Sequence, residues 1–111
     1  MRRLTALAAT ALAIACQRTP EEQQADRLRA EANQRAAVIE NRAMTEAKQL
    51  DQQADILDNQ SSEAGGYTGQ RLKVRADALA KEAQIVRKQA RMQADAIKES
   101  ADARIKTFQS R

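Results

Sequence analysis

The chain has 111 residues, of which 31% are charged and 2% aromatic, and its formal net charge is +4. A chain of this length forms one modest domain, and it cannot build a thick globular core because most of its 42% hydrophobic content is alanine. With no histidine and one cysteine, it also excludes Cys/His metal sites and Ser-His or Cys-His nucleophilic pairs, so we expect no cofactor and no enzyme.

The first predicted element is a secretory signal at residues 1–15. Arg2 and Arg3 precede an apolar run at residues 4–14, which is too short to span a bilayer because the hydrocarbon core requires about 20 residues. Without these two arginines the chain has 17 basic and 15 acidic residues, a net charge of only +2. Since no interleaved aromatic residues are available to stack on bases, we expect no nucleic-acid partner.

The only cysteine lies where this apolar run ends. The stretch Leu12-Ala13-Ile14-Ala15-Cys16 resembles the lipobox of bacterial lipoproteins, although Ala13 replaces the leucine of the best-known pattern. The resemblance implies cleavage before Cys16, acylation of Cys16 with chains such as palmitate, and a lipid-anchored tether at residues 16–19. Several chains are needed, because one anchors only marginally. Gln17 is not the aspartate that retains enteric lipoproteins at the inner membrane, which favours the periplasmic face of the outer membrane.

Two alternatives remain for this segment. Ala13-Ile14-Ala15 also fits ordinary signal cleavage, which would leave a free thiol in the periplasm. The segment could also stay uncleaved as a weak anchor.

Two helices are predicted after the tether, at residues 20–62 and 70–111, with a glycine-rich turn at 63–69. Thr19 and Glu22 form a T-x-x-E capping box, and Pro20 suits the first helical position. Gly65 or Gly66 can adopt the left-handed conformation that ends a helix. Thr68 is the predicted N-cap of the second helix.

Apolar residues follow a 3-4-4 spacing in both helices. The first predicted seam comprises Ala25, Leu28, Ala32, Ala36, Ile39, Ala43, Ala47, Leu50, Ala54 and Leu57. The second comprises Leu72, Ala76, Leu79, Ala83, Val86, Ala90, Ala94, Ile97, Ala101, Ile105 and Phe108. An eleven-residue repeat gives 3.67 residues per turn and favours straight or slightly right-handed packing.

Folding the seams antiparallel places large residues opposite small ones. The expected pairs are Ala43 with Val86, Ile39 with Ala90, Ala32 with Ile97, Leu28 with Ala101, and Ala25 with Ile105. Residues 17–63 hold 6 basic and 10 acidic residues, net −4, whereas 64–111 hold 11 and 5, net +6. We therefore predict an all-α fold, a long antiparallel αα-hairpin of coiled-coil type. The alternatives are one continuous helix, which the glycines disfavour, and a disordered chain.

Apolar residues outside the seams suggest a homo-oligomer. Burying them against a second copy would give a four-helix assembly. These residues are Val38, Ile56, Val74, Ile85 and Met92.

Two places are candidate binding sites. Tyr67, at the hairpin tip, is a candidate partner contact, or it simply covers the loop. At the other end, four basic residues are candidate contacts for anionic headgroups, or form a solvated terminus. These are Arg18, Arg104, Lys106 and Arg111.

The lipobox with a short alanine-rich coiled coil resembles the small helical envelope lipoproteins, such as the murein lipoprotein. That family attaches to peptidoglycan through a carboxyl-terminal lysine and forms one unbroken helix, and this chain departs from it at Arg111 and at the central glycines. Residues 25–49 also resemble the b-type peripheral stalk of ATP synthases in their mixture of basic, acidic and alanine residues. We expect a non-enzymatic, lipid-anchored spacer or scaffold of the cell envelope. The alternative is a protein-binding module, such as an inhibitor, toxin or periplasmic chaperone that docks partner helices.

Overall fold

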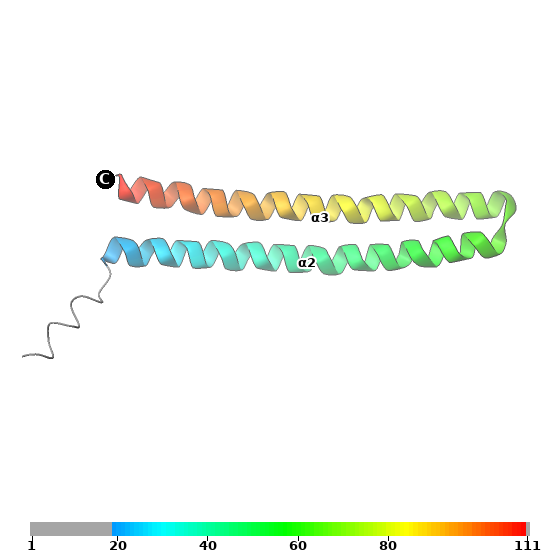
Figure 1. Cartoon of the computed structure of the whole chain (residues 1–111), viewed down its shortest axis with the longest axis horizontal. Coiled ribbons are helices and arrows are strands. Elements are labelled where there is room, and N and C mark those ends of the chain that lie inside the picture. The colour runs from blue at the N-terminus through cyan, green and yellow to red at the C-terminus, as the bar shows by residue number, and fades with distance from the viewer. Residues whose placement is uncertain (1–18, 111) are drawn as a thin grey trace, which may run out of the picture.

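The computed structural model describes residues 19–110, which form two long helices, α2 (Pro20–Ala64) and α3 (Gly66–Gln109). The helices lie side by side in opposite directions, so that the start of α2 and the end of α3 share one end of the molecule (Figure 1). At 1.5 Å per residue, each helix is about 66 Å long. The predicted all-α antiparallel hairpin is confirmed. Residues 1–18, which include the predicted signal and Cys16, lie outside the described residues.

Helix α2 begins as its sequence predicts. The hydroxyl oxygen of Thr19 accepts a hydrogen bond from the backbone N–H of Glu22 at 3.1 Å, which satisfies one of the free donors of the first turn. Pro20 is the first residue of the helix, where its missing N–H has no cost. Glu21 and Glu22 place negative charge at the positive end of the helix dipole.

The turn between the helices is shorter than the predicted 63–69, because only Gly65 lies outside both helices. Gly65 and Gly66 both have positive φ, 64° and 58°, a conformation that residues with a β-carbon rarely adopt. Two such residues in succession reverse the chain, and the next helix resumes at once. The prediction that Thr68 caps α3 is therefore wrong: Gly65 occupies the cap position, and Thr68 lies within the helix.

The core of the hairpin is made of alanine. Of the twelve buried hydrophobic residues in the described region, eleven are alanines, and Ala47, Ala83 and Ala94 have no exposed surface. The full set is Ala25, Ala32, Ala36, Ala43, Ala47, Ala54, Ala76, Ala83, Ala90, Ala94, Ala101 and Ile105. All twelve belong to the two predicted seams. The larger seam residues, except Ile105, are half-buried, because they lie at the edges of the contact rather than in its centre.

The register of the hairpin agrees with the expected pairs. Leu28 and Ala32 of α2 share one surface depression with Ala101 and Ile97 of α3. Ile39 and Ala43 share another with Ala90 and Val86. Large and small residues therefore face each other across the seam.

Because eleven residues correspond to three helical turns, we predict that facing blocks of this length can be removed without disturbing the seam. Deleting residues 30–40 together with 89–99 should give a hairpin about 16 Å shorter that keeps its helicity and unfolds cooperatively. The measurement is circular dichroism during thermal unfolding.

The matched control deletes nine residues from each arm, 30–38 with 91–99. Nine residues rotate the open-end part of each helix by roughly 180° relative to the tip part, so the alanines of the two parts no longer form one seam and this variant should unfold at a clearly lower temperature. Equal stability of the two deletion variants would contradict the claim that the alanine seam holds the helices together.

Candidate functional site

The tip of the hairpin presents one aromatic side chain. Tyr67 lies in the first turn of α3 and not in a loop, and its side chain is 74% exposed. The guanidinium carbon of Arg71, one turn further along α3, lies 5.9 Å from the centre of the Tyr67 ring. This cation–π contact holds the ring beside a positive charge.

Behind the tip, the backbones of the two helices nearly touch. The Ser61 hydroxyl donates a hydrogen bond to the carbonyl oxygen of Gly69 at 2.6 Å. A β-carbon at Gly69 would lie 2.7 Å from the backbone oxygen of Ser61. Gly69 is therefore required by this close approach and not by a left-handed conformation. Together with Gly65 and Gly66, it fixes the geometry from which Tyr67 projects.

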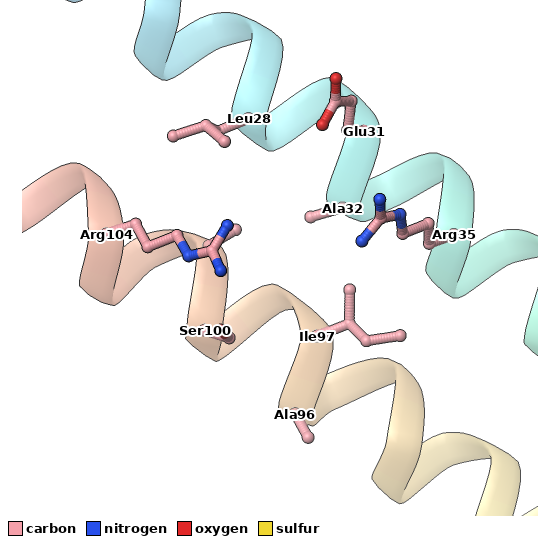
Figure 2. A pocket seen from close by; sticks show the side chains of 9 residues that line it. Leu28, Glu31, Ala32, Arg35, Ala96, Ile97, Ser100 and Arg104 are labelled. Atoms are coloured by element: carbon pink, nitrogen blue, oxygen red, sulfur yellow. The ribbon is translucent and has the colours of Figure 1, made fainter.

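The open end of the hairpin carries the predicted basic residues that the structure describes. Arg104 and Lys106 are both exposed, but two residues of helix separate them by about 200° around α3, so they do not share a face. Arg104 lines a depression together with Leu28 and Arg35 of α2 (Figure 2). Arg18, Arg111 and Cys16 lie outside the described residues.

One side of the hairpin, which we call the apolar side, carries three connected depressions. The first lies between Leu28 and Ile97, where Ile97 points from α3 toward Ala32 of α2 (Figure 2). The second shares Ile97 with the first and adds Val38 and Ile39. The third shares Ile39 with the second. The charged residues that line these depressions are Glu31, Arg35, Arg42, Glu46 and Arg104.

The eleven-residue repeat extends the apolar side along the hairpin. Residues eleven apart lie on one row of a helix, so Leu50 continues the row of Leu28 and Ile39, and Phe108 that of Val86 and Ile97. A further row on α3 joins three exposed residues at the same spacing: Val74, Ile85 and Ala96. Val38 and Ile85 are 50% and 53% exposed.

This asymmetry of the two sides differs from the prediction. The seam residues and the apolar residues outside the seams were predicted, but the large seam residues were expected to fill the core. The signal was present in the repeat, because Leu28, Ile39 and Leu50 recur at one position of the eleven, whereas Ala25, Ala36 and Ala47 recur at another.

The other side of the seam carries the ion pairs that connect the two helices. Arg87 of α3 pairs with Asp51 of α2 at 2.5 Å, and Lys73 of α3 pairs with Asp58 of α2 at 2.8 Å. Both follow the predicted distribution of charge, acidic on α2 and basic on α3. The hydrogen bond and the charge of Asp58 raise the pKa of Lys73 above its ordinary value. All four side chains are well exposed, so these ion pairs help to orient the two helices relative to each other and add little to stability.

Three kinds of feature are absent from the described region. Within residues 19–110, no group of three or more acidic, histidine or cysteine side chains is placed to hold a metal ion. No polar or charged side chain is buried in this part of the chain. Neither α2 nor α3 is apolar enough along its length to cross a bilayer. The surfaces available for function are therefore the tip, the open end and the apolar side.

Comparison with known proteins found no match to a protein family, to a curated protein or to a solved structure.

The close approach at Gly69 gives a direct test of how the tip is built. Gly69→Ala should lower the free energy of unfolding by about 1–3 kcal/mol, because the added methyl group must push the two backbones apart. Urea unfolding measures this change. The matched control, Thr68→Ala, alters an exposed neighbour in the same turn and should stay within about 0.5 kcal/mol. Equal effects would show that the backbones are not in contact here.

Proposed function

We propose that this protein is a lipid-anchored, non-enzymatic spacer or scaffold of the bacterial cell envelope, held at the periplasmic face of the outer membrane by acyl chains on Cys16. The observation that carries the proposal is the position of Cys16. It follows a short apolar run and a small residue, and it precedes a helical hairpin by only three residues.

The shape of the hairpin supports a spacer. Both the start of α2 and the end of α3 lie at the end nearest the proposed anchor, and the tip lies at the opposite end (Figure 1). An upright hairpin would therefore hold Tyr67 about 66 Å from the membrane surface. Arg104 and Lys106 would lie near the headgroups, where basic side chains are attracted to anionic lipid.

A protein-binding module is the second candidate, and the apolar side favours it. Exposed apolar rows beside charged residues are typical of surfaces that dock a partner helix. The two candidate functions overlap, because a scaffold can carry such a surface and a binding module can carry an anchor. They differ mainly in the partner.

The anchor is tested by expressing the full chain in a bacterium with two membranes and measuring the intact mass of the protein and its distribution between membrane and soluble fractions. The wild-type protein should begin at Cys16, carry the added mass of acyl chains and stay with the outer membrane. Cys16→Ser should remove the acyl mass and release the protein from the membrane fraction.

Ala13→Leu is the matched control, since it changes the same segment toward the commoner lipobox pattern and should keep both acylation and attachment. A mature wild-type protein without acyl chains would overturn the proposal. Equal membrane attachment of the Cys16→Ser variant would do the same.

A further inference from the structure

We propose that the apolar side is the interface of a symmetric dimer, in which two copies of this hairpin pack face to face as a four-helix bundle with both tips at the same end. This inference stands on the described hairpin and does not require Cys16 to be acylated.

The proposed interface consists of the large residues that the alanine seam leaves partly exposed. Alanines fill the centre of the contact between α2 and α3, so the larger residues Leu28, Ile39, Val86 and Ile97 are only half-covered by their own chain. All four line the three connected depressions of the apolar side. A second layer of helices on this side would complete their burial, as happens in the core of a four-helix bundle.

The available area is sufficient for a stable dimer. The apolar side extends from Leu28 to Leu50 on α2, which is about 33 Å of helix. Two neighbouring helices present a width of about 20 Å, which gives about 660 Å² per copy. The two copies together would bury about 1,300 Å², within the range of specific protein–protein interfaces.

A second copy suits this surface because the same patch can pack on itself across a two-fold axis, so that a residue of one copy contacts a second residue of the other copy and the reverse contact also forms. Two face-to-face arrangements have such symmetry. With the axis along the hairpins, the tips lie together and α2 of each copy faces α3 of the other. With the axis across the hairpins, the tips lie at opposite ends and each helix faces its own copy.

The net charge of the whole helices favours one of these arrangements. Helix α2 holds 10 acidic and 5 basic residues, net −5, and α3 holds 10 basic and 5 acidic residues, net +5. Tips-together packing brings each helix opposite one of the other sign, whereas the tip-to-tail arrangement brings like charges together over the whole length. The favoured arrangement also places the start of α2 of both copies at one end, which suits the proposed attachment of both chains to one membrane.

Photocrosslinking of the full chain in cells tests the interface, with p-benzoylphenylalanine in place of Val38 on the apolar side. The control position is Met44, which is 63% exposed on the same helix but lines a depression with Glu40 and Arg87 on the other side of the seam. Irradiation should give a product of twice the chain mass from position 38 and not from position 44. No double-mass product, an adduct with a different protein, or equal products at both positions would overturn the proposal.

Mapping the product from a mixture of ¹⁴N- and ¹⁵N-labelled chains tests the arrangement. Because Ile39 faces Ala90 in the hairpin, position 38 should attach to residues 85–97 in α3 of the other copy. Attachment to α2 of the other copy would show tip-to-tail packing and overturn the arrangement.

Substitution at the same two positions tests the energetics, using sedimentation equilibrium of the purified full chain in detergent. Val38→Glu should weaken dimerisation at least about tenfold, because it places a charge at the interface in both copies. Met44→Glu should change it less than about threefold. Circular dichroism checks that both variants keep the helicity of the hairpin. A wild-type chain that stays monomeric at micromolar concentration, or equal effects of the two substitutions, would contradict the dimer whether or not Cys16 is acylated.

Discussion

Close packing of buried alanines along the seam between α2 and α3 is the interaction on which this molecule depends. Alanine loses no side-chain entropy in a helix and lets two backbones approach more closely than leucine does, so many small contacts replace a few large ones. Buried alanines from Ala25 to Ala101 and the glycine contact at Gly69 keep this approach along the hairpin. The arrangement has a limit, because alanine buries little area and two helices alone enclose a thin core.

The same seam makes the two sides of the hairpin different. Large residues at one position of the eleven-residue repeat emerge on the apolar side, whereas the ion pairs of Asp51 and Asp58 connect the helices on the other. The alanine seam thus lies between the side that carries the interhelical ion pairs and the side that carries the large half-buried residues. Within residues 19–110, no polar or charged side chain is buried, and no group of three or more acidic, histidine or cysteine side chains is placed to hold a metal ion.

The helices, the seams and their register could be predicted because each depends on local signals. Thr19 and Pro20 mark a helix start, the 3-4-4 spacing marks the buried row, and the glycines mark the reversal. The length of the turn could not be predicted, because it depends on Gly65 and Gly66 adopting positive φ in succession, and a glycine-rich stretch is compatible with many turns. The apolar side was also missed. Whether a large seam residue such as Ile97 fills the centre or lies at its edge depends on how closely the helices approach, and spacing alone does not determine that distance.

The most direct test of the alanine seam compares two neighbouring alanines of α2. Ala36 is 1% exposed in the seam, and Ala37 is exposed to solvent. Thermal or urea unfolding at one fixed protein concentration should show that Ala36→Leu lowers the free energy of unfolding by about 1–3 kcal/mol, because the larger side chain forces the helices apart. Ala37→Leu should change it by less than about 0.5 kcal/mol. If the two substitutions have the same effect, the helices are not held together by close contact between alanines.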